Sequence, residues 1–428
     1  MRKVSLIFMV LFISFSSLLI FSSRFPEQDS DELAALTEKV KRLEVVMENN
    51  RRAGKRVHEL VEKRRPPPIP VLVFACDRPW AVRDHLWKLV EYRRPDKRQF
   101  PIIVTQECDD ERVREEVQKF GDQVEYVKHV SGRKTNVSIG SGHERFATYY
   151  MISRHYKLAL DYVFNEKHFS SVIITEDDLD IAPDFFSYFS NTRHLLDVDP
   201  TLWCVSAWND NGQPENIDRN ASATLYRTDF MSGLGWMITS KTWQELGPIW
   251  PAAFWDDWMR DPERRKGRQC VRPEVSRSGM SAHGRHGASS GQFFSNHLTK
   301  VWLNEKSTDF SRVNLDYLLP NKFKQRMQRK VMEEAVEMSM QQAMHFISMP
   351  ENAGKSVRVH YTGNVDFVEK AAQLGIMGDF KAGVPRTAYA GTVTCFKNGV
   401  RVFLVADRSR IFDYVPTWTV LPSLGDTL

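Results

Sequence analysis

The sequence predicts an α/β protein with a mainly parallel sheet, a smaller α+β region after it and a helical segment before it. Short apolar runs of buried-strand length alternate with stretches of helical periodicity over residues 71–315. Strands and helices that alternate in this way form parallel sheets, which bind ligands at the carboxyl ends of their strands. Functional residues are therefore expected directly after the apolar runs.

The first element is a candidate membrane anchor over residues 1–23. Residues Val4–Ser23 carry no charge and follow Arg2 and Lys3. Roughly 20 apolar residues span a bilayer, whereas the apolar region of a signal peptide has about 7–15. We therefore expect a transmembrane anchor with a cytoplasmic N-terminus, and a cleaved signal peptide is the alternative. Both interpretations send the rest of the chain into the secretory lumen.

Residues 24–70 are predicted to form a helical stem and a Pro-rich linker. Apolar residues at alternating spacings of three and four indicate a short coiled-coil seam: Leu33, Leu36, Val40, Leu43 and Met47. This seam predicts self-association, and a solvated charged helix is the alternative. Prolines at 66–68 and 70 stiffen the exit from the stem.

The folded region is predicted to divide at about Leu315 into a domain over 71–315 and a second one over 316–428. Strands are expected in the first domain at Val71–Ala75, Ile102–Val104, Val124–Val127 and Val172–Thr175. Helices are expected over Ala81–Tyr92 and Arg145–Phe164. The second domain begins with a helical stretch rich in Met and Gln, then has short strands at Val357–Tyr361, Gly391–Phe396 and Val400–Val405.

The composition excludes two classes of protein. The excess of Lys and Arg over Asp and Glu is 59 − 54 = +5, and these basic residues are dispersed, which argues against nucleic-acid binding. A single apolar segment excludes a polytopic transporter.

Two glycosylation sequons, at Asn136 and Asn220, agree with a lumenal address. The five cysteines contain no CxxC pair, and in an oxidising compartment they allow two bridges whose pairing the spacing does not determine.

Three consecutive carboxylates, Glu176–Asp178, follow a predicted buried strand. Ionised groups so close together repel one another unless a cation or a polar ligand compensates them. Few oxygen ligands suit Mg²⁺ or Mn²⁺, which keep water and substrate phosphates in their coordination shell. The alternative is an acidic helix N-terminus, in which the acids from Asp178 to Asp184 precede a helix and interact favourably with its dipole.

A second unusual group is Trp255–Trp258, in which two tryptophans flank Asp256 and Asp257. A partly dry aromatic wall raises the pKa of a carboxylate toward that of a general base. The alternative is a Trp-rich loop in which one of the acids caps a helix. Two loops of small residues, 233–236 and 287–291, permit close backbone approach but fit neither dinucleotide nor phosphate-loop spacing.

Two single residues are ambiguous from the sequence alone. Arg78 follows the first strand and either grips a ligand or pairs with a neighbouring carboxylate. His155, on the long helix, reads as a core or surface residue rather than a ligand.

Long runs of this sequence resemble the alpha-1,3-mannosyl-glycoprotein 2-beta-N-acetylglucosaminyltransferase family, N-acetylglucosaminyltransferase I of the Golgi. The resemblance covers essentially residues 71–405. The runs that carry it are ACDRPW (75–80), SRHYKLALDYVF (153–164), EDDLDIAPDFFSYF (176–189), LWCVSAWNDNG (202–212), LYRTDFMSGLGWM (225–237), WPAAFWDDWMR (250–260), VRPEVSRS (271–278), SGQFF (290–294) and GVPRTAYAGTV (383–393).

The resemblance implies a GT-A fold, a Rossmann-like nucleotide-sugar domain, with a smaller C-terminal domain and a type II anchor in the Golgi membrane. It implies transfer of N-acetylglucosamine (GlcNAc) from UDP-GlcNAc, with Mn²⁺ and inversion, to the α1,3-arm mannose of a five-mannose N-glycan. Asp256 matches the catalytic base and Asp178 the metal ligand. The sugar-donor positions match Arg78, Glu107, His155, Glu176, Asp177 and Ser289. The family's disulfides match Cys76–Cys108 and Cys204–Cys270, which leaves Cys395 free.

Two departures from the family pattern affect the sugar-donor site. Glu107 stands where the family usually has Asp, so its carboxylate is displaced by one methylene. The loop 277–291, with His283 and His286, is longer than usual, which affects the alignment of Ser289.

Two other functions are weighed against this one. A related enzyme extends O-linked mannose, but it carries an additional stem domain for which residues 24–70 are too short. A catalytically silent lumenal lectin or scaffold would be expected to lose the EDD or WDDW acids, and both are present.

Overall fold

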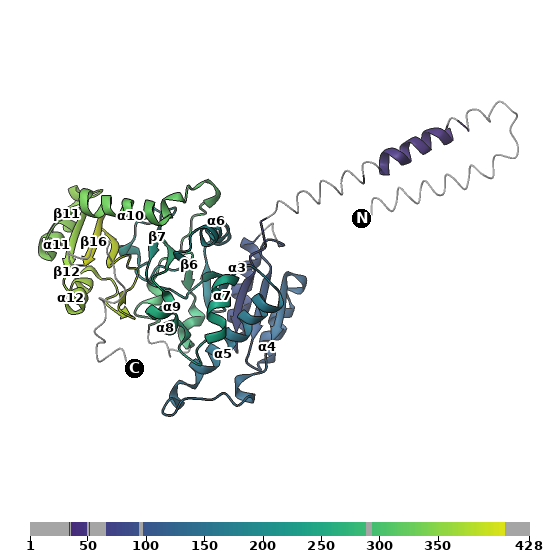
Figure 1. Cartoon of the computed structure of the whole chain (residues 1–428), viewed down its shortest axis with the longest axis horizontal. Helices are drawn as coiled ribbons and strands as arrows, with labels where there is room; N and C mark the ends of the chain where they lie inside the picture. Colours follow the sequence, from purple (N-terminus) through teal and green to yellow (C-terminus); the bar gives the residue numbers. More distant parts are fainter. Residues whose placement is uncertain are drawn as a thin grey trace. The chain divides into compact units, whose positions relative to one another are not determined.

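The computed structural model describes residues 34, 36–48, 51, 66–93, 97–287 and 293–406, in two compact units, Met1–Pro66 and Pro67–Leu428. In the first unit, residues 36–48 are helical (Figure 1). The expected seam residues Leu36, Val40, Leu43 and Met47 are all exposed on this helix. The described residues include no helix long and apolar enough to cross a membrane, and the expected anchor at Val4–Ser23 lies outside them.

The second unit is built around an eight-stranded mixed sheet in the order β3-β2-β1-β4-β8-β6-β9-β7. Strands β1, β2, β3, β4, β6 and β9 run in one direction, and β8 and β7 run against them. Their bounds are β1 (Val71–Ala75), β2 (Ile102–Gln106), β3 (Val124–Lys128), β4 (Ser171–Glu176), β6 (Leu202–Ser206), β7 (Leu225–Thr228), β8 (Trp236–Thr239) and β9 (Gln269–Pro273). The expectation of a mainly parallel sheet is confirmed.

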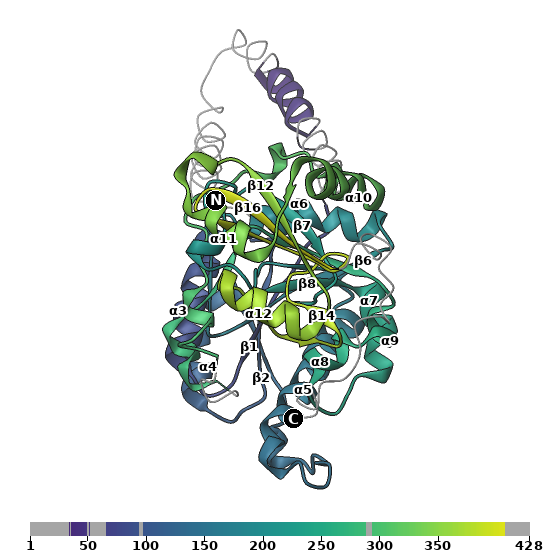
Figure 2. The same ribbon diagram turned by 90° about the vertical axis from the view of Figure 1, so that its left-hand side faces the viewer.

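Helices cover both faces of this sheet because alternate residues of its buried strands point to opposite sides. Val71 and Val73 of β1 pack in one core cluster with side chains of α3 (Pro79–Tyr92), α4 (Glu111–Gln118) and α6 (Phe185–Val198). Leu72 and Phe74 pack in a second cluster with α5 (Ala147–Asp161) and α7 (Ser240–Leu246). Figure 2 shows α3 and α4 on one side and α7, α8 (Trp255–Arg260) and α9 (Pro262–Arg265) on the other.

Two local expectations differ from the structure. The long helix expected over Arg145–Phe164 ends as an α-helix at Asp161 and continues as a π-helical turn, Tyr162–Glu166. The acidic triplet does not lead directly into a helix, because β5 (Leu179–Ile181) intervenes and pairs with β10 (Ser278–Met280). A helix does follow these acids, because Asp184 is the N-cap residue of α6, but β5 separates Asp178 from that helix.

The C-terminal region forms a smaller sheet with the order β11-β12-β16-β15. Its strands are β11 (Val336–Glu337), β12 (Ser356–Tyr361), β15 (Thr392–Lys397) and β16 (Val400–Ala406). Around it lie α10 (Pro320–Gln328), α11 (Met340–Ser348), α12 (Asn364–Leu374) and a hairpin of β13 (Phe380–Lys381) and β14 (Val384–Pro385). This sheet has a core cluster of its own, yet Phe403 and Val405 belong to the main cluster. The α+β character is confirmed, and a domain boundary at Leu315 stays a prediction.

The cysteine pairing implied by the resemblance is confirmed. Cys76 bonds to Cys108, and Cys204 on β6 bonds to Cys270, its register partner on β9. Cys395 is buried and free.

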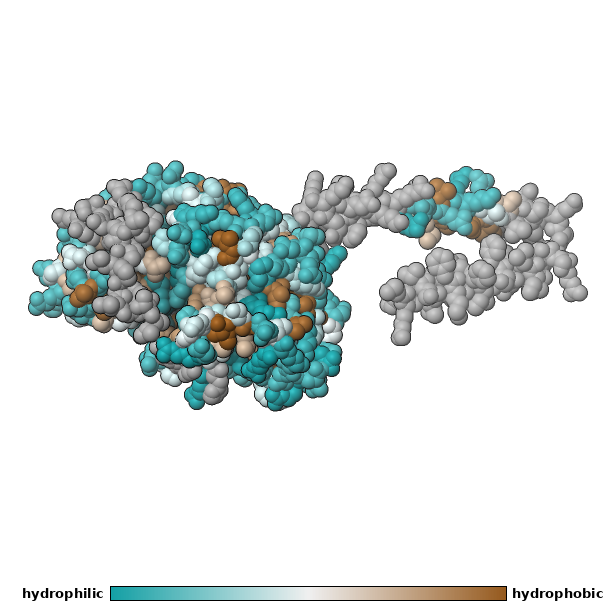
Figure 3. Space-filling model, turned by 60° about the horizontal axis from the view of Figure 1, so that its bottom comes forward, coloured by the Kyte–Doolittle hydropathy of each residue, from teal (hydrophilic) through white to brown (hydrophobic). Residues whose placement is uncertain are grey.

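The face of the molecule in Figure 3 is mainly hydrophilic, with separate small hydrophobic patches, as expected of a globular protein in water.

Candidate functional site

The carboxyl ends of the parallel strands place the sequence-predicted residues at one edge of the main sheet. Arg78 follows β1, Glu107 follows β2, and Glu176 ends β4 and leads into Asp177 and Asp178. These strands are adjacent in the sheet and parallel. Five of the predicted site residues therefore lie at this edge, where the α/β pattern places functional residues.

Arg78 lies against the acidic triplet. Its Nη1 donates to Asp178 Oδ2 at 2.7 Å and its Nη2 donates to Asp177 Oδ1. The same Nη1 is 3.3 Å from the carbonyl oxygen of His283, so the loop after β10 closes over the arginine. Of the two interpretations of Arg78, pairing with a neighbouring carboxylate is the one seen.

Asp177 and Asp178 are buried, Glu176 is partly buried, and all three carboxyl groups interact with the single guanidinium of Arg78. Burial, together with the charge of Asp178, raises the pKa of Glu176 to about 7. Burial also raises the pKa of Asp177 to about 8, against the opposing charge of Arg78. Because Asp177 Oδ2 and Asp178 Oδ1 are buried without a hydrogen-bond partner, two acceptor oxygens remain available.

These two oxygens fit a divalent cation that takes few ligands from the protein. In the described part of the chain, no group of three or more His, Cys, Asp or Glu side chains could hold a metal ion by itself. Most ligands of a cation here would therefore be water or substrate oxygens.

Glu107 and His155 line the neighbouring part of the edge. Arg154 donates to Glu107 Oε1 and to the carbonyl oxygen of Val130, the latter at 2.9 Å. A Cβ at Gly132 would lie 2.9 Å from Glu107 Oε1, so only glycine leaves room for the longer side chain. His155 Nε2 is 3.0 Å from Thr105 Oγ1, and burial lowers the pKa of His155 to about 3, which keeps its imidazole neutral.

Helix α8 carries Asp256 and Asp257 in its first turn, after Phe254 in a left-handed conformation (φ 54°). Neither acid is the N-cap residue, so the capping alternative is not what the structure shows. Arg260 Nη1 donates to both carboxylates at 2.8 Å. The two carboxylates are 42% and 48% exposed, so the tryptophans do not shield them from water as expected. The aromatic side chain of Trp255 is instead buried on the inward side of α8.

An aromatic stack joins α8 to the acidic triplet. Trp255 stacks on Tyr156 with ring centroids 4.3 Å apart, and the Tyr156 hydroxyl donates to Glu176 Oε1 at 2.7 Å. A Cβ at Gly233 would lie 3.0 Å from the Trp255 ring, which explains the small-residue loop at this point. The charge of Asp256 contributes to the raised pKa of Glu176, because the two carboxylates lie near each other.

The loop that closes the edge is described only in part. Ser289 lies outside the described residues, so its predicted role stays a prediction. The residues before it approach the triplet, since Ser281 N donates to the Asp178 carbonyl at 2.9 Å. His283 Nε2 is 3.0 Å from Asp84 Oδ2, which fixes this loop to α3.

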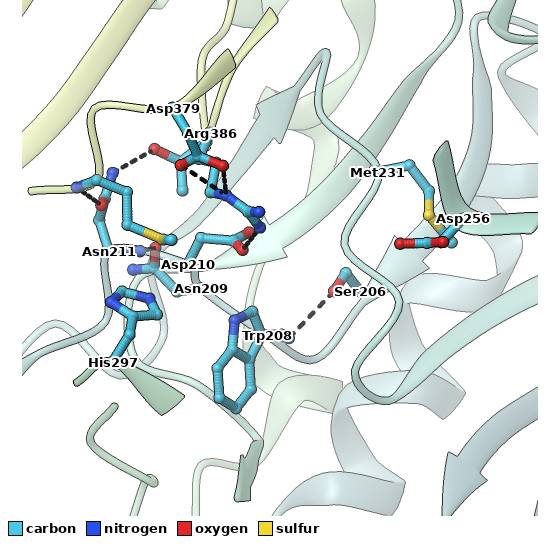
Figure 4. A network of polar contacts seen from close by, with 12 residues as sticks. Ser206, Trp208, Asn209, Asp210, Asn211, Met231, Asp256, His297, Asp379 and Arg386 are labelled. Carbon is cyan, nitrogen blue, oxygen red and sulfur yellow. Dashed lines mark hydrogen bonds and ion pairs between the residues drawn. The ribbon is translucent and has the colours of Figure 1, made fainter. Parts of the chain in front are cut away.

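Sequence reasoning missed a second polar cluster, shown in Figure 4. It consists of Asp210, after β6, and Asp379 and Arg386, on either side of the β13–β14 hairpin. Asp210 and Arg386 both lie in sequence runs that carry the family resemblance, and this position could have identified them as candidate site residues. Sequence reasoning also missed Arg154, Tyr156 and Arg260, whose roles depend on contacts with Glu107, Glu176 and Asp256.

Comparison with known proteins agrees with the resemblance. The GNT-I family matches residues 13–418. The alpha-1,3-mannosyl-glycoprotein 2-beta-N-acetylglucosaminyltransferase of Arabidopsis thaliana is 38% identical over 357 residues, which cover 83% of this chain and 78% of the relative.

Two solved structures show weak and partial similarity to this chain. The mannosyltransferase PcManGT from Pyrobaculum calidifontis, in complex with GDP-Man and Mn²⁺, has a TM-score of 0.33 and 14% identity over 49% of this chain and 55% of that one. S. aureus TarS 1–349, in complex with UDP-GlcNAc, has a TM-score of 0.35 and 9% identity over 61% of this chain and 64% of that one. Both matches span less than two thirds of the solved chain.

The family assignment rests on the sequence matches. The GNT-I match runs through the strand ends, the acidic triplet, α8 and the hairpin, which are the segments that build the edge described above. This chain belongs to the GNT-I family.

Proposed function

We propose that this protein is an inverting glycosyltransferase of the GT-A fold. It moves GlcNAc from UDP-GlcNAc, in β1,2 linkage, to the α1,3-arm mannose of the N-glycan Man5GlcNAc2. Family membership supports the reaction, and one observation carries the mechanism: Tyr156 contacts both Glu176, in the sugar-donor site, and Trp255, beside the base. The candidate base and the sugar-donor site are thereby held next to each other.

The sugar donor is held along the carboxyl ends of β1, β2 and β4. Glu107 is a buried acceptor suited to the imide N–H of uracil, and neutral His155 adds a second polar contact. Arg78 faces the diphosphate as well as the acids and provides positive charge there. Glu176 and Asp177 bind the ribose hydroxyls and the surrounding water in this proposal.

Asp178, whose Oδ1 is buried without a hydrogen-bond partner among the described residues, would hold the divalent cation, which we infer to be Mn²⁺. When bound, the cation would neutralise negative charge on the diphosphate of departing UDP.

Asp256 acts as the general base. Its exposed carboxylate accepts the proton of the mannose 2-hydroxyl while that oxygen attacks C1 of the GlcNAc unit. The C1–O bond to the β-phosphate breaks on the opposite face, so the anomeric centre inverts. Arg260 orients the Asp256 carboxylate through its 2.8 Å hydrogen bond. A single base and a diphosphate leaving group suffice, whereas glycosidases use two carboxyl groups.

We also propose that the protein is a type II membrane protein of the Golgi, with its catalytic domain in the lumen. Two disulfides suit an oxidising compartment, and the sequon residues Asn136 and Asn220 are exposed. The uncharged segment Val4–Ser23 supports the anchor. The exposed apolar row on the 36–48 helix supports self-association of the stem.

Incubation with UDP-GlcNAc, Mn²⁺ and a panel of acceptors tests this function. We expect GlcNAc transfer to Man5GlcNAc2, with a β1,2 linkage on linkage analysis. Preferred transfer to an O-mannosyl peptide would support the related O-mannose enzyme instead. Binding of mannosides without any transfer would support a silent lectin.

A further inference from the structure

We infer that the cluster of Asp210, Asp379 and Arg386 binds the hydroxyl groups of the acceptor sugar; this inference rests on the proposed function. Arg386 Nη1 donates to Asp210 Oδ1 at 2.7 Å, and Arg386 Nε lies 2.9 and 2.8 Å from the two carboxylate oxygens of Asp379. None of these residues belongs to the sugar-donor site.

The position of the cluster suits an acceptor. Strand β6 runs parallel to β4, so Asp210 lies at the same sheet edge as the acidic triplet. The hairpin between Asp379 and Arg386 reaches α8, because Lys381 Nζ lies 3.6 Å from Asp257 Oδ2. In the sheet, β4 lies between β6 and the strands β1 and β2 that carry the uridine-binding residues, and the hairpin of the cluster contacts α8, the helix of the candidate base.

One aromatic ring connects the cluster to the base. Arg386 lies over Phe230 at 5.0 Å from the ring centroid, and Arg260, which pairs with Asp256, lies over the same ring at 4.9 Å. Figure 4 shows Arg386 with Asp210 and Asp379 at one side of the view and Asp256 at the other. A sugar unit whose hydroxyl reaches Asp256 would extend from that carboxylate toward the cluster.

The cluster keeps hydrogen-bonding capacity for a ligand. Within the described part of the chain, Arg386 Nη2 donates no hydrogen bond, although Nε and Nη1 do. The Asp379 side chain is 39% exposed and accepts only from Arg386 among the described residues. An open carboxylate edge beside two open N–H groups can bind the vicinal hydroxyls of a neutral pyranose.

The alternative is that the cluster only holds the C-terminal region to the main sheet. Arg401 provides a matched control for that role, because it also comes from the C-terminal region and pairs at 2.9 Å with Glu274, which follows β9. Substitution of a sugar-binding ion pair should raise the acceptor KM, whereas substitution of a purely structural ion pair should leave the acceptor KM unchanged.

The test compares the Asp379→Asn, Arg386→Lys and Arg401→Lys proteins with the wild type, using UDP-GlcNAc, Mn²⁺ and Man5GlcNAc2. We expect Asp379→Asn and Arg386→Lys to raise the acceptor KM roughly 10–100-fold, the worth of a charged hydrogen bond. Their sugar-donor KM should stay within about twofold of wild type, as should both constants of Arg401→Lys. The wild type should distinguish the complete mannoside from analogues that lack one hydroxyl. The Asp379→Asn protein should distinguish them less, as measured by the ratio of their kcat/KM values.

Two outcomes overturn the inference in distinguishable ways. An unchanged acceptor KM in folded Asp379→Asn, with normal wild-type transfer, overturns the acceptor site alone. If the wild type binds UDP-GlcNAc yet transfers to no mannose acceptor, the proposed function fails and the inference fails with it.

Discussion

The guanidinium of Arg78 lies 2.7 Å from the carboxylate of Asp178, although the two residues come from the ends of different strands. The residue expected to contact the nucleotide thus pairs with the residue expected to hold the cation. Binding of a cation with UDP would require Arg78 to share or release Asp178. The diphosphate offers the guanidinium a replacement partner, so cation and nucleotide should bind together rather than separately.

We therefore expect Asp178→Ala to abolish Mn²⁺-dependent UDP binding, measured by calorimetry with and without the metal. The fold should persist, because loss of the Arg78 pair is offset by weaker repulsion within the buried triplet. Asp180→Ala is the matched control: Asp180 is two residues away, partly exposed and paired with Lys88. UDP binding by Asp178→Ala with an unchanged Mn²⁺ dependence would show that Asp178 is not the ligand.

The disulfide between Cys204 and Cys270 joins neighbouring strands and closes a loop with a sequence separation of 66. We expect a Cys204→Ala, Cys270→Ala protein to lose about 4 kcal/mol of unfolding free energy in the chain-entropy account. Peptide mapping without reduction should recover both bridges. Cys395 should react with an alkylating agent only after unfolding, because it is buried. A second reactive thiol in the unfolded, unreduced protein would contradict the pairing.

How far the sequence predicted the fold depends on whether the signal was local. Strands β1, β2 and β4 each contain a continuous apolar run, so their existence and the position of Glu176–Asp178 followed from the local pattern. Strand β5 is short and pairs with β10, about a hundred residues later in the sequence. The residues next to the triplet therefore carry no local pattern that predicts this strand.

The candidate site was predictable where a single segment carries it. His155 contacts Thr105 only because of how α5 packs on β2, which no local pattern reveals. Asp210 and Arg386 are 176 residues apart in sequence, so their ion pair is a tertiary property. The resemblance located the segments of that cluster without assigning either residue a role.

Stability should depend on the pH through His85, which is buried between α3 and β4. Its Nδ1 lies 2.6 Å from the Leu179 carbonyl and therefore carries the proton, while Nε2 accepts from Thr175. Burial lowers the pKa of His85 from 6.5 to about 4. Between these pH values only the unfolded chain protonates this imidazole, so the stabilisation present above pH 6.5 is lost as the pH falls.

We expect this histidine to cost about 2 kcal/mol of unfolding free energy between pH 7 and pH 5. His85→Asn keeps a donor toward Leu179 but does not titrate, so its loss over the same interval should be smaller by that amount. Urea unfolding of both proteins at the two pH values measures the difference, in which other titrating groups cancel. Equal losses in both proteins would contradict the assignment.

Asp256→Asn should lower kcat by roughly 10²–10⁴, because Asn keeps the size and the contact with Arg260 but accepts no proton. The KM for UDP-GlcNAc should change little, since the residues proposed to contact uridine and the cation lie on α5 and at the ends of β1, β2 and β4. A loss confined to kcat marks an interaction made in the transition state. Asp257→Asn is the matched control: Asp257 shares Arg260 at the same 2.8 Å and comparable exposure, but it also faces Lys381. Its kcat should remain within about tenfold of wild type, while its acceptor KM rises. If folded Asp257→Asn is inactive while Asp256→Asn turns over, the base is the other carboxylate of this pair.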